Sequence, residues 1–168
     1  MGNAQHKNDS TVSRLAGDDC VIERPGETRF LAQRAEHYDG FVDDLNHYLQ
    51  SRYNFKTKPV LEPFSERSPI EVRRAAVKLF LRFQPGYRQY TRYSLVVVDA
   101  YFRDNKQGET DAFFKFLLDQ SEQRDILEIY LEPYSGVHKG VVRSYKLNKA
   151  EGWHGWQISC DDLKRTMG

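Results

Sequence analysis

The stretch Ser94-Leu95-Val96-Val97-Val98-Asp99-Ala100-Tyr101-Phe102 begins the part of the chain that decides the fold, residues 94–156. Because the stretch is almost continuously apolar, it predicts a strand that is covered on both faces. A polar loop with one glycine follows at 103–110, then a helical pattern at 109–123 and a second strand at 126–132. Strand, glycine loop, helix and strand in this order direct backbone N–H groups at a phosphate. The layout favours an enzyme that uses a nucleotide-like cofactor.

The segments on either side of this stretch predict a mixed central sheet with flanking helices. After the second strand, the pattern predicts a helix at 137–147 and an aromatic strand near 153–158. Before the first strand, apolar residues spaced three to four apart from Leu31 to Leu49 predict an amphipathic helix, in which Gly40 marks a kink or a break. Residues 51–68 are predicted as a loop with a short strand near Val60.

The stretch 69–84 fits two patterns. Its start, Ser68-Pro69-Ile70-Glu71, is typical of a helix N-terminus. The alternation of apolar and basic residues between 77 and 83 is typical of a strand. We predict a helical turn at 69–75, a strand at 76–83 and a hairpin into 93–102.

The composition is that of one globular domain. The chain has 168 residues and a net charge of +1, so no global field steers it toward nucleic acid or an anionic membrane. Residues 1–20 predict a flexible polar arm, which leaves 21–168 as a single α/β (α+β) domain. No apolar run approaches the length of a membrane span. Cys20 and Cys160 fit no metal spacing and predict free thiols in a reducing, cytoplasmic compartment.

Two motifs in the second half carry a resemblance. Gly108 and Thr110 precede an apolar helix start at 112–118, and His138, Val141 and Tyr145 are followed by Gly152-Trp153. Over about 85–160 this spacing resembles the GCN5-related N-acetyltransferase (GNAT) family. In that family a loop of the form Arg/Gln-x-x-Gly-x-Gly/Ala holds the pyrophosphate of acetyl-coenzyme A with its backbone amides. The family's next helix has the form Asn-x-x-Ala-x-x-x-Tyr and is followed by Gly-Phe.

The resemblance implies a GNAT-like fold, acetyl-CoA as co-substrate and an acetyltransferase activity. Asn105 stands where Arg or Gln is usual in the family's loop. A backbone N–H where the first long strand splays, near Val97 or Val98, would stabilise the oxyanion. The residues implied to bind the cofactor are Val97, Val98, Arg103, Lys106, Gln107, Gly108, Thr110 and His138.

The same resemblance implies the catalytic groups. Tyr145 matches the family's general acid, which protonates the coenzyme thiolate; a free phenol, with a pKa of about 10, can donate to a thiolate of similar basicity. Glu132, at the end of the second strand, is the expected general base for the attacking amine, with Glu128 and Asp99 as rivals.

Three functions stay open on the residues alone. The first is transfer of an acetyl group to an amine acceptor, which is a small molecule, a protein or an aminoacyl-tRNA. The second is a non-catalytic partner-binding or effector-type protein on the same fold, because Glu109 and Asp111 would lie near an anionic pyrophosphate and weaken its binding. The third is an RNA-contacting module, because basic and aromatic residues alternate at 87–93. The histidines are too isolated to predict a metal site, and a homodimer stays open.

Overall fold

The computed structural model describes residues 27–61, 69–84, 94–103, 107–152 and 154–168. The predicted arm at 1–20 and the basic, aromatic segment at 87–93 lie outside these ranges. The described part is one α+β domain with an open, mixed six-stranded sheet and four helices. In chain order its elements are α1 (Glu27–Tyr53), β1 (Ile70–Arg73), β2 (Val77–Gln84), β3 (Ser94–Phe102), α2 (Gln107–Gln123), β4 (Glu128–Leu131), α3 (His138–Ser144), β5 (Asn148–Lys149), β6 (Trp156–Ser159) and α4 (Cys160–Met167).

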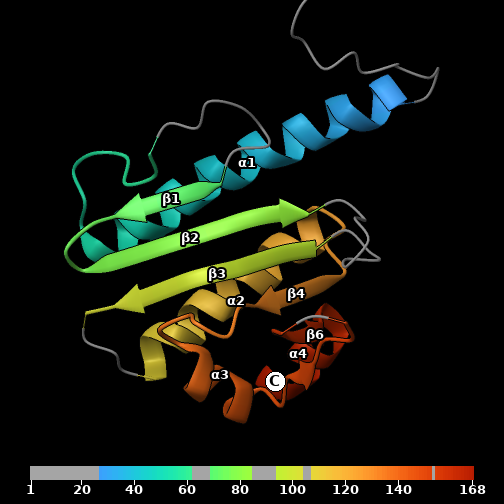
Figure 1. Cartoon of the computed structure of the whole chain (residues 1–168). Helices are drawn as coiled ribbons and strands as arrows, with labels where there is room; N and C mark the ends of the chain where they lie inside the picture. Colours follow the sequence, from blue (N-terminus) through green and yellow to red (C-terminus); the bar gives the residue numbers. More distant parts are fainter. Residues whose placement is uncertain (1–26, 62–68, 85–93, 104–106, 153) are drawn as a thin grey trace, which may run out of the picture.

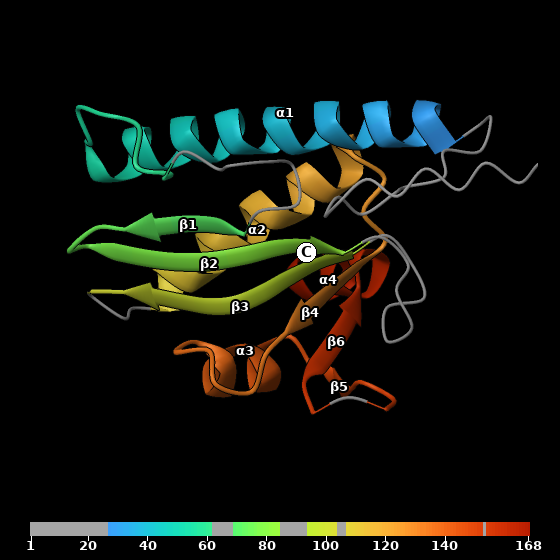
Figure 2. The ribbon, with the colours of Figure 1, turned by 45° about the horizontal axis from the view of Figure 1, so that its top comes forward.

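The strands lie in the order β1-β2-β3-β4-β6-β5; Figure 1 labels all of them but β5, which is labelled in Figure 2. The pairs β1/β2, β2/β3, β4/β6 and β5/β6 are antiparallel, whereas β3 and β4 are parallel and are connected through α2. Helices α1 and α2 cover one face of the sheet, and α3 lies on the other (Figure 2). Among the described helices, none covers the part of that second face formed by β1 and β2 (Figure 2), so every second side chain of these strands points away from the two long helices.

The main core lies between the sheet and the two long helices. Phe41, Leu45 and Leu49 of α1 are fully buried, as is Phe113 of α2. Phe41 meets Phe83 of β2 edge to face, with ring centroids 5.0 Å apart. Because the side chains of β2 alternate between its two faces, Val77, Leu79 and Leu81 enter this core, whereas Lys78, Phe80 and Arg82 lie on the opposite face.

Most predicted elements in the first half are confirmed, and two predictions are wrong. The stretch 69–75 contains a strand, β1, rather than a helical turn, because Ile70 and Val72 pair with β2 and enter the core. Gly40 does not break α1. A Cβ there would lie 3.0 Å from Nη2 of Arg124, so the missing side chain makes room for that guanidinium. Arg124 donates to the His37 carbonyl oxygen (3.1 Å) and to Asp44 (2.7 Å), which fastens α2 to α1.

The second half follows its predicted order. The helix predicted at 109–123 is α2, and the strands predicted at 94–102 and 126–132 are β3 and β4. The predicted helix 137–147 is shorter, because α3 ends at Ser144, and the aromatic strand is β6. Strand β5 and helix α4 were not predicted. The described residues contain no helix that is long and apolar enough to cross a membrane.

Candidate functional site

The pairing of the parallel strands β3 and β4 stops part-way along β3, because β4 ends there. Their pairing runs from Ser94 opposite Glu128 to Val97 opposite Leu131, and Glu132 N–H then donates to the Val97 carbonyl oxygen (3.0 Å). Strand β4 ends at Leu131, whereas β3 continues to Phe102. The edge of β3 that follows Val97 is thus released from its parallel partner. We call this place the divergence of β3 and β4.

A β-bulge lies at the same point of β3. On the β2 side, Phe80 pairs with Asp99 but Leu81 pairs with Val97, so Val98 is an extra residue. Bulges increase the local twist and redirect the side chains and backbone groups around them. The bulge therefore turns the backbone of β3 at the residue where β4 leaves it.

The segment after β4 returns to the released edge of β3. Gly136 N–H donates to Oδ1 of Asp99 (3.0 Å), and a Cβ on Gly136 would lie only 3.0 Å from the carbonyl oxygen of Ala100. Val137, which follows Gly136, and Val141 of α3 are both buried. Segment 135–141 therefore packs tightly against β3 beyond the divergence.

The start of α2 is held by α1. The Glu109 carboxylate accepts hydrogen bonds from Nε and Nη2 of Arg52 (2.7 and 2.9 Å) and from the hydroxyl of Tyr53 (2.8 Å). The bond to Glu109 raises the pKa of Arg52, and burial together with the same carboxylate raises the pKa of Tyr53. Glu109 is thereby neutralised by a bidentate arginine, so it repels a nearby anion much less than a lone carboxylate would.

The residues beside Glu109 differ in exposure. Gly108 is exposed, and a Cβ at this position would meet no other group within 4 Å. Thr110 is buried, with 6% of its surface exposed. The first N–H groups of a helix have no partner within the helix, so α2 offers donors on the open side of Gly108.

Tyr145 directly follows α3 and links it to α2. Its side chain is buried, its ring centroid lies 5.3 Å from that of Phe114, and its hydroxyl hydrogen-bonds to Oδ1 of Asp111. Asp111 is half-buried and, like Glu109, is hydrogen-bonded to a side chain of another element. The two carboxylates that flank Thr110 are thus both engaged by neighbouring side chains.

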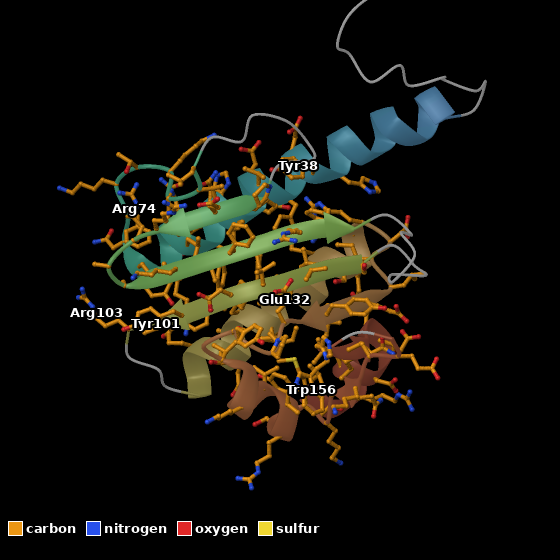
Figure 3. The ribbon with its side chains drawn as sticks, in the orientation of Figure 1. Tyr38, Arg74, Tyr101, Arg103, Glu132 and Trp156 are labelled. Carbon is orange, nitrogen blue, oxygen red and sulfur yellow. The ribbon has the colours of Figure 1, made fainter. Side chains whose placement is uncertain are left out.

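The three candidate bases occupy different places. Glu132 is half-buried at the vertex of the divergence, with its backbone bonded to Val97 (Figure 3). Glu128, at the start of β4, accepts a hydrogen bond from the hydroxyl of Tyr130 (3.0 Å). Asp99 is exposed on the face of the sheet opposite α1 and lies next to the bulge at Val98.

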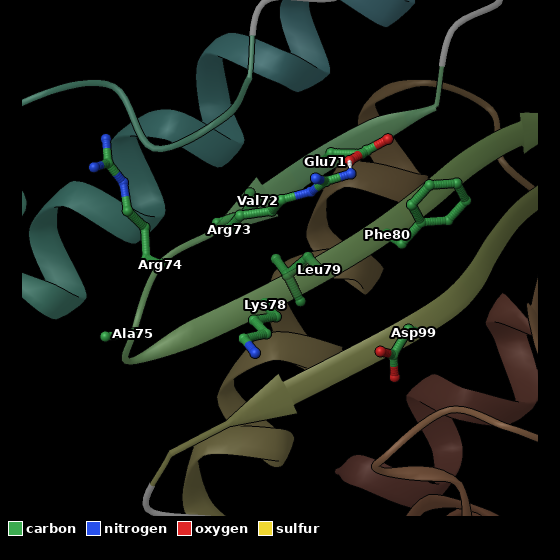
Figure 4. A pocket seen from close by; sticks show the side chains of 9 residues that line it. All are labelled: Glu71, Val72, Arg73, Arg74, Ala75, Lys78, Leu79, Phe80 and Asp99. Atoms are coloured by element: carbon green, nitrogen blue, oxygen red, sulfur yellow. Dashed lines mark hydrogen bonds and ion pairs between the residues drawn. The ribbon is translucent and has the colours of Figure 1, made fainter.

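Two hollows border this region. One, of about 480 Å³, lies over β1, β2 and β3 on the face that α1 does not cover (Figure 4). Glu71, Arg73, Lys78, Phe80 and Asp99 are among its lining residues. The other, of about 470 Å³, is lined by residues of α2 and α4 and by Ser144 and Tyr145. Both volumes are of a size that holds small ligands.

Of the other residues predicted to bind the cofactor, the structure describes some but not all. Arg103 is exposed, and its N–H donates to the Ala76 carbonyl oxygen (2.9 Å). Gln107 and His138 begin α2 and α3, and Lys106 lies outside the described residues. In the described ranges no three His, Cys, Asp or Glu side chains are grouped as metal ligands. Cys160 is a free thiol whose Sγ lies 3.1 Å from the Ile126 carbonyl oxygen.

Two features were missed by the sequence analysis. Arg52 and Tyr53 belong to no sequence motif, and their hydrogen bonds to Glu109 form only because α1 ends over the start of α2. The hollow on the sheet had a signal, because Lys78 and Phe80 alternate with core residues and must share a face. No protein-family model matches the chain, and no curated protein sequence is similar to it. Function must therefore be argued from the divergence and its surroundings.

Proposed function

We propose that the protein is an N-acyltransferase with a GNAT-like fold that moves an acetyl group from acetyl-CoA to an amine. The divergence of β3 and β4 carries the proposal. Of two parallel strands joined by a helix, the shorter ends beside a bulge in the longer, and the helix begins shortly after the longer strand ends. This arrangement offers a released strand edge for an extended ligand and, beyond it, helix N–H donors for a phosphate.

The start of α2 supports the coenzyme end of the site. Gly108 leaves its side of the helix open, and its backbone and that of Thr110 belong to the first turn. An anion here gains from unpaired N–H groups and from the positive end of the helix dipole. The link between Glu109 and Arg52 removes most of the repulsion that the sequence suggested for this carboxylate.

The chemistry proposed at the vertex is direct transfer. The amine nitrogen attacks the thioester carbonyl, whose oxygen becomes anionic and is stabilised by a backbone N–H near Val98. A carboxylate beside the vertex, Glu132 or Asp99, takes a proton from the attacking ammonium. The C–S bond breaks with its electron pair on sulfur, and the thiolate receives a proton from Tyr145. For this last step the coenzyme sulfur must replace Asp111 as the hydrogen-bond acceptor of the phenol.

A second function is favoured by one observation. Segment 135–141 packs against the same edge of β3, with Gly136 close to Ala100. On a protein that binds a partner without catalysis, this packing would be permanent and no coenzyme would enter. On an acyltransferase, the segment must shift when the pantetheine arm binds. The half-buried thiol of Cys160 suits a reducing compartment such as the cytoplasm under either function.

Thermal unfolding of the full chain with acetyl-CoA separates the two functions. At one hundred times its Kd, a ligand of the folded state adds about 2.7 kcal/mol of stability. For a chain of this length that amounts to roughly 5–11 °C in Tm. Thiol release from acetyl-CoA in the presence of mixed amines then reports transfer. No shift at millimolar acetyl-CoA would reject the acyltransferase and leave the binding function.

Two variants make the thermal test specific. Gly108→Val adds a branched side chain on the open side of α2 and should weaken acetyl-CoA binding at least tenfold. Ser51→Val adds the same side chain at an exposed position of α1 and should leave binding unchanged. Equal binding by both variants would remove the start of α2 from the site.

A further inference from the structure

The hollow on the sheet face is built from three adjacent strands. Glu71 and Arg73 come from β1, Lys78 and Phe80 from β2, and Asp99 from β3 (Figure 4). In the sheet register, Glu71 lies beside Phe80, which lies beside Asp99. These side chains stand on three paired strands rather than on loops, so the sheet sets their relative positions before any ligand arrives.

The hollow is lined by charged side chains of both signs, and not all of them are paired with an opposite charge of the protein. Glu71 and Arg73 pair with each other. Lys78 forms no ion pair with any described residue; its ammonium lies 5.9 Å from the ring centroid of Tyr101. Asp99 is exposed and accepts one hydrogen bond, from Gly136 N–H, on Oδ1. Arg74 also lines the hollow, but its guanidinium donates to the Thr57 hydroxyl and to the Lys58 carbonyl oxygen, so Lys78 and Asp99 are the cation and the carboxylate that remain available to a ligand.

Both Lys78 and Asp99 are neighbours of Phe80: Lys78 lies two residues earlier on β2, and Asp99 lies opposite Phe80 on β3. Because Phe80 pairs with Asp99 and Lys78 pairs with Tyr101, Lys78 and Asp99 are diagonal neighbours on adjacent antiparallel strands. Such neighbours lie about 7–8 Å apart, which leaves room for a small group bonded to both. The half-buried Phe80 offers an apolar surface next to both charges, and the Arg82 guanidinium lies 5.2 Å from its ring centroid.

We infer that this hollow binds the acyl acceptor and that the acceptor is an α-amino acid with an apolar side chain. Its ammonium pairs with Asp99, its carboxylate pairs with Lys78, and its side chain packs on Phe80. Asp99 directly follows the bulge at Val98, so the bound ammonium lies next to the divergence. The inference rests on the proposed acyl transfer for its reaction, but not for the binding of the amino acid.

The reaction balances with these groups. Asp99 accepts one proton from the ammonium, and the free amine attacks the acetyl carbon. The new C–N bond forms, the C–S bond breaks, and the electron pair of that bond stays on the coenzyme sulfur. The sulfur gains one proton and the amide nitrogen keeps one. The products are an N-acetyl amino acid and coenzyme A, and Asp99 returns its proton to solvent.

The same charges disfavour other occupants of the hollow. Single-stranded RNA would place phosphates beside Phe80, where the Arg82 guanidinium lies 5.2 Å from the ring centroid, but the carboxylates Glu71 and Asp99 flank that ring in the register and would repel them. A second copy of the chain would bring one exposed lysine and one exposed arginine of β2 against their equivalents. A zwitterion satisfies both Lys78 and Asp99 at once.

Calorimetry of the full chain without coenzyme tests the pocket. Titration with leucine and phenylalanine is compared with their decarboxylated amines and their deaminated acids. The amino acids should bind at least tenfold more tightly than either analogue, because each analogue leaves one charge unpaired. Asp99→Asn, which keeps an oxygen for Gly136, and Lys78→Met, which keeps the alkyl stem, should each weaken binding about tenfold or more. The exposed controls Asp43→Asn and Lys56→Gln should bind as the parent does.

Thiol release with acetyl-CoA then tests the role of the pocket. If amino acids bind and are acetylated, and Asp99→Asn lowers turnover without lowering acetyl-CoA binding, the inference holds. If decarboxylated amines are acetylated as well as amino acids, the acyl transfer stands and the acceptor assignment is overturned. If amino acids bind but no thiol is released, the pocket stands and its acceptor role falls. If amino acids do not bind and single-stranded RNA does, the face is a nucleic-acid surface and the inference is wrong.

Discussion

The hydrogen bond between Tyr145 and Asp111 joins α3 to α2 and can be measured with a double-mutant cycle. Tyr145→Phe keeps the ring against Phe114 and removes only the hydroxyl. Hydrogen bonds to charged groups contribute about 1.5–3 kcal/mol. Because Asp111 is only half-buried, water solvates it once the phenol is gone, and the lower part of that range applies. We expect Tyr145→Phe to lower the free energy of unfolding by about 1.5–2 kcal/mol.

Urea unfolding of four proteins gives the coupling: the parent, Tyr145→Phe, Asp111→Ala and the double variant. The account predicts that the double variant is about 1–2 kcal/mol more stable than the sum of the single losses implies. For a chain of this length, the loss in Tyr145→Phe corresponds to roughly 3–8 °C in Tm. Tyr134→Phe is the matched control, because the Tyr134 side chain is 91% exposed and should lose nothing. Additivity within about 0.5 kcal/mol would refute the link between the two helices.

Three further predictions concern the rest of the structure. Gly136→Ala should lower the free energy of unfolding by about 1–3 kcal/mol, because its Cβ would lie 3.0 Å from the Ala100 carbonyl oxygen. The control Gly152→Asn should lower it less, because Gly152 has a φ of +69° and open space around it. Equal losses in urea unfolding would contradict the packing of Gly136 against β3. Tyr48→Phe should leave stability at pH 7 equal or higher by about 1–3 kcal/mol, because the buried Tyr48 hydroxyl has no hydrogen-bond partner among the described residues; a clear loss would show that it has one. Burial raises the pKa of Tyr48 from 10.0 to about 12, so the folded state holds a proton that the unfolded state releases above pH 10. The stability of the parent should therefore fall as pH rises from 10 toward 12. Urea unfolding at about pH 9 to 11.5 should show a steeper fall for the parent than for Tyr48→Phe.

The elements that could be predicted are those with a strong local period. Strand β3 and helix α2 follow from a continuous apolar run and from a 3.6-residue repeat, and both were placed within two residues of their observed ends. Strand β1 was missed because Pro69 and Glu71 imitate a helix start, and only pairing with β2 reveals the strand. The continuity of α1 through Gly40 depends on Arg124, which lies far away in sequence.

The sequence predicted the backbone elements of the candidate site but not the side-chain contacts within it. The order of strand, loop and helix indicated where a phosphate would be held, and α2 does begin there. The partners of Glu109 and Asp111 are set by α1 and α3, which no short-range pattern connects to α2. The divergence is a property of register, which a single strand does not encode. Asp99 and Lys78 needed the pairing of β2 with β3 before they could be read as neighbours.

The central claim is that acetyl-CoA binds along the released edge of β3 and at the start of α2. Amide hydrogen exchange with and without saturating acetyl-CoA tests it most directly, because exchange is read residue by residue. The account predicts slower exchange at residues 98–102 and 108–110, with altered exchange in segment 135–141 as it makes room. Unchanged exchange in these three segments, or protection confined to the face of β1 and β2, would contradict it.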